Sequence, residues 1–178
     1  MPETDWSIIE EIVRSALIEH SEIDWGMTQR ACRLLPFLVE GLEDVSLVHA
    51  RLLCLFAPLQ IPADNPSIRG NWIKPLRSAG IDLPTQAWLW IALQRYRHAP
   101  DTSEELAVHD AWALEAVGAP GIAKAFIRGG RMSRDLHEIV QDMRDTLSNS
   151  VFLTPAGRRL GVRRIVVTRR FLKDLEEG

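Results

Sequence analysis

Four polar side chains have the types that acid–base catalysis needs: Asp24, His98, His109 and Asp110. A histidine titrates near neutral pH and can exchange a proton with a neighbouring carboxylate or with a substrate. His98 with Asp101, or His109 with Asp24, would form such a pair if the fold brings the two residues together. We therefore consider these four residues candidates for a catalytic site.

A second kind of chemistry would use Cys54 as a nucleophile that a histidine activates. This cysteine lies within Leu52–Phe56, a strongly apolar stretch, and a thiol in such surroundings is typically buried and inert. We interpret Cys54 as a packing residue. Only one other cysteine is present, Cys32, and two isolated thiols favour a cytoplasmic protein.

The composition predicts one soluble globular domain over residues 1–178. Of the 178 residues, 46% are hydrophobic and 25% are charged, so the chain has enough apolar surface to form a core. No run of about 18 consecutive apolar residues is present, and a membrane partner is therefore not expected.

Apolar residues recur at helical spacing along most of the chain, and strand-like stretches are nearly absent. We therefore predict an all-α, single-domain helical bundle. Residues 57–84 contain five prolines and two glycines, which indicate a connector with one short helix near 72–79. Pro36 should kink its helix or end it early, and Gly129-Gly130 should end another. The other helices we expect cover about 8–17, 25–39, 44–56, 86–98, 103–117, 120–127, 133–147 and 155–175.

The stretch Val108–Phe126 has the sequence V-H-D-A-W-A-L-E-A-V-G-A-P-G-I-A-K-A-F, and Gly129-Gly130 follows it. It resembles a signature of HD-domain phosphohydrolases, V-Q-D-A-D-R-L-D-A-L-G-A-x-G-I-A-R-x-F followed by a glycine pair. Three further passages fit the order of that family: Asp24-Trp25, Tyr96–His98 and Thr154–Glu176. The resemblance covers about residues 20–178 and implies an HD-type helical bundle.

The resemblance also implies a metal site, in which histidines and aspartates hold divalent cations that activate water. The positions of these ligands are occupied here by Met27, Cys54, Leu55 and Trp112, although Asp110 survives if the first aspartate of the D-x-D motif is the ligand. In the family, an adjacent histidine and aspartate serve as two of the ligands, and Cys54-Leu55 occupies their place here. A slipped alignment places His49-Ala50 there instead, which recovers the histidine and still loses the aspartate. Thioether, alkyl and indole groups do not suit such cations.

We therefore expect a degenerate HD-type protein that has lost metal-dependent hydrolysis, needs no metal or other cofactor, and binds a small ligand or a partner protein. Its pocket would lie at the former metal site, lined by Met27, Cys54, Leu55 and Trp112. In a competing interpretation this cavity is closed and Trp112 fills it. The alternative function is hydrolysis of a phosphate ester or nucleotide at a different site, made by the four candidate acid–base residues.

A second alternative rests on a cluster of seven cations in 16 residues near the C-terminus: Arg158, Arg159, Arg163, Arg164, Arg169, Arg170 and Lys173. Such a helix can bind phosphate or nucleic acid. The formal net charge of −3 and the lack of interleaved aromatic residues argue against nucleic acid. The cations would equally suit a solvated face, or a pairing with the first 24 residues, which carry seven acids and one arginine.

Overall fold

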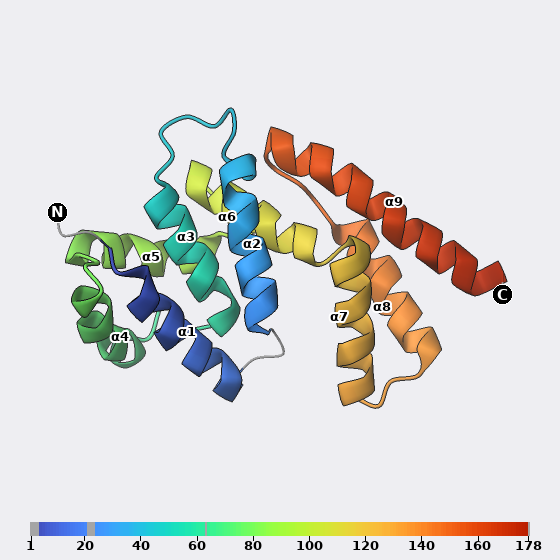
Figure 1. The fold of residues 1–178 in the computed structure, drawn as a ribbon, viewed down its shortest axis with the longest axis horizontal. Coiled ribbons are helices and arrows are strands. Elements are labelled where there is room, and N and C mark those ends of the chain that lie inside the picture. The colour runs from blue at the N-terminus through green and yellow to red at the C-terminus, as the bar shows by residue number, and fades with distance from the viewer. Residues whose placement is uncertain (1–3, 21–23, 63, 178) are drawn as a thin grey trace.

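The structure is a computed structural model that describes residues 4–20, 24–62 and 64–177. All regular secondary structure in these ranges is helical, which confirms the predicted all-α fold (Figure 1). No helix in the described ranges is long and apolar enough to span a membrane. The helices are α1 (Trp6–His20), α2 (Trp25–Leu38), α3 (Leu47–Phe56), α4 (Pro66–Ser78), α5 (Leu83–Arg95), α6 (Ser103–Glu115), α7 (Gly118–Arg131), α8 (Leu136–Asn149) and α9 (Pro155–Glu177), with a 3-10 turn at Ala57–Leu59.

Short polar side chains fix where most of these helices begin. Asp24 Oδ1 accepts a hydrogen bond from the backbone N–H of Met27 at 2.7 Å and caps α2. Asp135 forms a complete capping box with Glu138 at the start of α8. Such caps satisfy backbone N–H groups that have no partner inside the helix.

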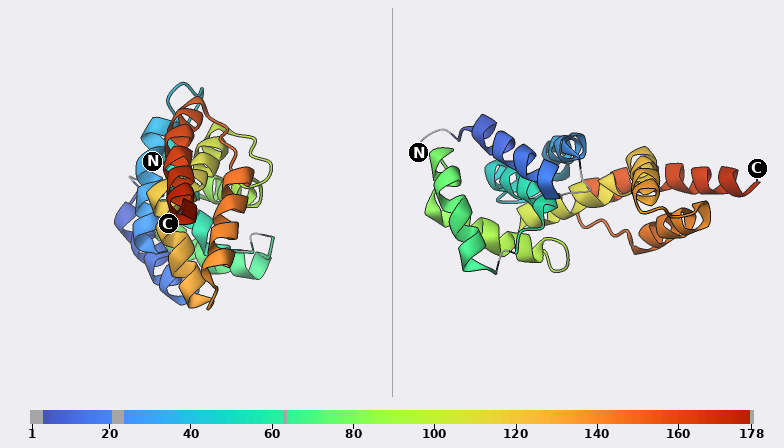
Figure 2. Two further views of the ribbon diagram at one scale, coloured as in Figure 1. Left: turned by 90° about the vertical axis from the view of Figure 1, so that its right-hand side faces the viewer. Right: turned by 90° about the horizontal axis from the view of Figure 1, so that it is seen from below.

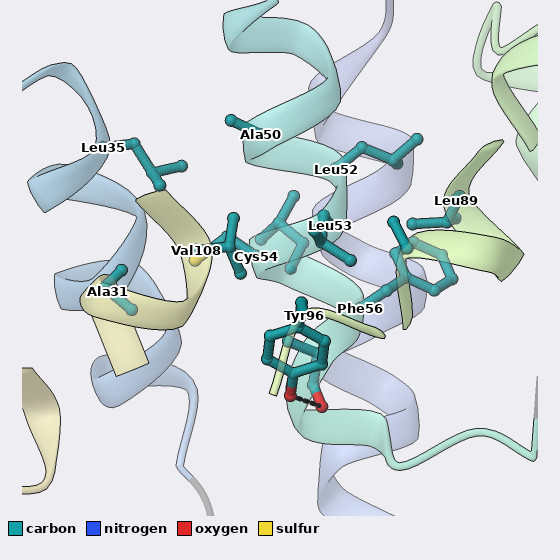
Figure 3. Packing of buried hydrophobic residues seen from close by; sticks show 14 of the residues in the cluster. Ala31, Leu35, Ala50, Leu52, Leu53, Cys54, Phe56, Leu89, Tyr96 and Val108 are labelled. Carbon is teal, nitrogen blue, oxygen red and sulfur yellow. Dashed lines mark hydrogen bonds between the residues drawn. The ribbon is translucent and has the colours of Figure 1, made fainter. Parts of the chain in front are cut away.

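The main core surrounds α3, as its nearly continuous apolar sequence predicts. Its residues from Ala50 to Phe56 are buried except Arg51. In Figure 3, Leu35 of α2 and Val108 of α6 lie on one side of α3, and Leu89 of α5 lies on the other. At the C-terminal end of α3, the hydroxyl of Tyr96 donates a hydrogen bond to the carbonyl oxygen of Ala57 at 3.2 Å (Figure 3).

A second, smaller core lies between α7, α8 and α9. It contains Ile139, Val140, Met143 and Leu172, and Phe126 and Phe171 stack edge to face beside it with ring centroids 5.9 Å apart. Figures 1 and 2 place this part at the opposite end of the molecule from α4. No ion pair recorded among the described residues joins the acidic N-terminal segment to an arginine of α9.

Residues 57–84 are more helical than the sequence indicates, so the connector interpretation is wrong for much of this stretch. The α4 helix begins at Pro66, and the Asn65 side chain caps it by accepting from the N–H groups of Ser67 and Ile68. A proline at the first helical position loses no hydrogen bond. Pro75 lies inside the same helix, which continues to Ser78.

The expected stop at Gly129-Gly130 is also wrong, because α7 continues through both glycines to Arg131. Gly129 is buried against α8, and a Cβ atom there would lie 2.4 Å from the Ile139 side chain. Close packing between α7 and α8 thus requires a glycine within the helix. Pro36 does not end its helix early, because α2 continues through it to Leu38, one residue before the expected end.

Candidate functional site

Asp110 is fully buried, and its hydrogen bonds connect α6 with the start of α9. Its Oδ1 accepts from the backbone N–H of Leu153 at 2.8 Å, and its Oδ2 accepts from the N–H and the hydroxyl of Thr154 at 2.7 and 2.8 Å. The Thr154 hydroxyl in turn accepts from the N–H of Gly157 at 2.8 Å and caps α9. Both carboxylate oxygens therefore accept hydrogen bonds that connect α6 with the residues just before α9. His109 Nδ1 lies 3.1 Å from Asp110 Oδ1, and its side chain is 19% exposed.

The other two candidate acid–base residues lie elsewhere. Asp24 is the cap of α2, and His98 is exposed in the turn after α5. Asp101, the expected partner of His98, forms an ion pair with Arg95 at 3.3 Å. Among the hydrogen bonds recorded for the described residues, only the one between His109 and Asp110 joins two of the four candidates.

The four positions at which the resemblance places metal ligands are divided between the core and two pockets. Met27 lines a pocket between α2 and α7, and Leu55 lines a different one between α2 and α3. Cys54 is fully buried in the main core. The indole nitrogen of Trp112 is buried next to Cys54, and its N–H acts to lower the pKa of that thiol, against the larger effect of burial.

These residues do not fit a divalent cation. Burial raises the pKa of the Cys54 thiol well above its ordinary value, and the neighbouring Cys32 raises it further. The Met27 thioether, the Leu55 alkyl group and the Trp112 indole are not ligands for such a cation, and Cys54 alone does not make a site. The described ranges contain no group of three or more His, Cys, Asp or Glu side chains placed to hold a metal ion.

The pocket beside Met27 has the chemistry of an anion site. It has a volume of about 450 Å³ and lies between α1, α2 and α7 (Figure 1); we refer to it as the α2–α7 pocket. Its apolar surface comes from Leu17, Trp25 and Met27, together with the exposed Ile18 and Ile127. Among the described residues, its charged lining contains one carboxylate, Asp24, and four cations: Arg14, Lys124, Arg128 and Arg131.

The local sequence explains why these groups meet. Lys124, Arg128 and Arg131 are separated by four and three residues, so they lie on one face of α7. The Asp24 cap fixes the first turn of α2, which carries Trp25 and Met27 into the pocket.

Asp24 and Met27 are among the site residues predicted from the sequence, but none of the three α7 cations is. Their spacing in the stretch K-A-F-I-R-G-G-R is the signal that identifies them. That signal is visible only if the helix is known to continue past Ile127.

No family model matches this sequence, and no curated protein matches it. Solved structures share its fold. YpgQ from Bacillus subtilis in complex with ADP is 22% identical, with a TM-score of 0.75, and the match covers 96% of both chains. A protein from Lactobacillus plantarum is 17% identical with a TM-score of 0.79, covering 99% of this chain and 97% of that one. The Lin1889 protein from Listeria innocua is 20% identical with a TM-score of 0.71, covering 98% and 96%.

Proposed function

We propose that this chain binds a phosphate-bearing small molecule of the nucleotide class in the α2–α7 pocket. The observation that carries the proposal is the set of four cations around an apolar surface that includes Trp25. Arginine and lysine form strong charge-assisted hydrogen bonds with phosphate oxygens, and an aromatic ring can stack on a base. The crystallisation of one fold neighbour, YpgQ, with ADP supports this ligand class.

In the same proposal the chain is an HD-type protein that no longer performs metal-dependent hydrolysis. The Val108–Phe126 signature supports the first part. The second part is supported by the side chains that stand where the metal ligands would be, above all the buried, protonated Cys54 and the engaged Asp110. Binding, rather than turnover, is the function that these residues favour.

Isothermal titration calorimetry with ADP tests the proposal. We expect ADP to bind, and each of the variants Lys124→Ala, Arg128→Ala and Arg131→Ala to bind about tenfold more weakly or worse, because a hydrogen bond to a charged group contributes about 1.5–3 kcal/mol. Adenosine should bind more weakly than ADP. Lys74→Ala removes an exposed cation from α4, at the other end of the molecule, and should bind like the wild type.

A hydrolysis assay on ADP and on a phosphate monoester, with Mg, Mn, Ni and Co supplied in turn, separates binding from catalysis. We expect no turnover above the rate without protein. Turnover that disappears in His109→Ala would overturn the binding assignment and support the alternative acid–base site. Failure of ADP, ATP and inorganic phosphate to bind would contradict the assignment of the pocket itself.

A further inference from the structure

The outward side of α9 carries cations around two exposed valines. Val162 and Val166 are 63% and 57% exposed, and they lie four residues apart on one side of the helix. Exposed cations adjoin them on both sides, and together they form the outer α9 face: Arg159, Val162, Arg163, Val166, Arg169, Arg170 and Lys173. At 1.5 Å per residue this face is about 21 Å long.

The arginines of α9 divide into two groups with different surroundings. Arg164 faces the body of the molecule, where it donates to the Leu114 carbonyl oxygen at 2.6 Å and pairs with Glu115 at 3.3 Å. The residues that α9 buries, among them Gly161, Thr168 and Leu172, lie on that same inner side. Most of the outer face points away from it, while Arg169 and Lys173 border the groove between α9 and α8. The α9 helix runs along the outside of the molecule in Figures 1 and 2.

The ion pairs recorded on the outer face are weak and confined to its C-terminal end. Arg170 lies 3.9 Å from Asp174, and Lys173 lies 3.4 Å from Glu177, both within the helix and both exposed. Exposed pairs of this kind contribute little, and an incoming carboxylate can replace them at small cost. The face therefore keeps a strong positive charge for a partner.

We propose that the outer α9 face docks an acidic amphipathic helix of a partner protein. An apolar stripe on such a helix would cover Val162 and Val166, while carboxylates beside the stripe would meet the flanking arginines. Charge complementarity selects this occupant over a symmetric pairing of two copies through α9, since two outer α9 faces would repel each other.

The valines also favour a protein over a nucleic acid. A phosphate backbone would engage the arginines and leave both valines without a partner. The face contains no aromatic residue on which bases could stack. The chain as a whole carries a formal net charge of −3, which opposes general attraction to polyanions.

The test uses the full chain and a synthetic helical peptide of about 20 residues, with leucines on one stripe and glutamates on both sides of it, measured by fluorescence anisotropy. We expect binding to this peptide, and binding about tenfold weaker to a scrambled peptide of the same composition. The double variant Val162→Ser/Val166→Ser should lose about tenfold in affinity for the ordered peptide, because apolar contact is lost without a change in charge. Arg163→Glu/Arg170→Glu should abolish binding.

Lys74→Glu, an exposed charge reversal on α4, is the matched control and should leave peptide binding unchanged. Equal affinity for the ordered and scrambled peptides, or no binding to either, would overturn the proposal. A DNA duplex that binds more tightly than the peptide, with a steep salt dependence and no effect of the valine variant, would replace the protein partner by nucleic acid. ADP binding to the α9 variants reports separately on the α2–α7 pocket, so the two proposals can fail independently.

Discussion

The contact between Asp110 and the first turn of α9 shows how one residue type can support two different interpretations. In the sequence, Asp110 stands in an HD-type signature and is a natural candidate for catalysis or metal binding. In the structure its oxygens accept hydrogen bonds from Leu153 and Thr154. These partners lie more than 40 residues further along the chain, and no local pattern connects them with Asp110. The structural role could therefore not be predicted from the sequence.

Gly157 is the counterpart of this contact, and replacing it should destabilise the fold. A Cβ atom at this position would lie 1.9 Å from Asp110 Oδ2. Gly157→Ala must therefore push the carboxylate away from its donors, and we expect the free energy of unfolding to fall by about 2–4 kcal/mol. Urea denaturation measures the change.

The matched control for that experiment is Gly130→Ala. Gly130 also lies in a helix, but a Cβ atom there would meet no heavy atom within 4 Å. Alanine is the better helix former, so this variant should be as stable as the wild type or up to about 1 kcal/mol more stable. If the two alanine variants have equal stability, the contact between Asp110 and Gly157 has been assigned incorrectly.

The two cysteines should differ sharply in reactivity. Thiol reagents attack the thiolate, and burial raises the pKa of Cys54 well above its ordinary value, so this thiol stays protonated at about pH 8 as well as shielded. Cys32 is only partly buried. We expect a disulfide reagent to modify Cys32 first in the native protein and to reach Cys54 only on unfolding. The variants Cys32→Ala and Cys54→Ala identify which thiol reacts, and similar rates for both would contradict the burial of Cys54.

At the scale of the helices, the sequence predicts elements well where a cap or an apolar stripe defines them. The Asp24 cap and Pro155 place the starts of α2 and α9 correctly. The sequence fails where distant contacts override a local breaker. Gly129 is such a case, because its lack of a side chain lets α8 approach α7.

That failure explains why most of the candidate pocket was not predicted. An α7 that ends at Ile127 does not include Arg128 or Arg131, so neither can be placed on a common face with Lys124. The α1 residues of the pocket could not be found either, because only the tertiary fold brings α1 near α7. The chemistry of the residues was visible in the sequence, but their convergence was not.

The junction between α7 and α9 contains a buried hydrogen bond in addition to its apolar contacts. Gly118 has a φ of +72° at the start of α7, and its N–H donates to Thr168 Oγ1 at 2.7 Å. Thr168→Val keeps the shape but leaves this N–H without an acceptor, which should lower the free energy of unfolding by about 1–3 kcal/mol. Urea denaturation checks this value.

Thr146→Val is the control, because it removes a hydroxyl that donates only to the Asp142 carbonyl oxygen within α8. No N–H group loses its acceptor there, so a change below about 0.5 kcal/mol is expected. If the free energy of unfolding falls equally in both variants, the hydrogen bond from the Gly118 N–H contributes no more stability than the hydroxyl contact of Thr146.

For the molecule as a whole, the important feature is the boundary between the two cores. Asp110 and the ion pair between Arg164 and Glu115 connect them, and both contacts involve α6 and α9. The α2–α7 pocket lies at the same boundary, since its lining comes from α1 and α2 on one side and from α7 on the other. A bound nucleotide would therefore hold the two parts of the molecule together.

This arrangement predicts that the smaller core opens separately from the larger one. The principal contacts of α8 are with α7 and α9, whereas α3 contacts α2, α5 and α6 in the main core. Hydrogen exchange should therefore be faster in α8 than in α3, and Val140→Ala should accelerate exchange in α7 and α8 while leaving α3 protected. Leu53→Ala, in the main core, should accelerate exchange in both parts.

ADP at saturation should slow exchange in α7, because a ligand that binds only the closed form stabilises it against opening. Uniform acceleration of α3 and α8 by Val140→Ala would instead show that the two cores unfold as one unit.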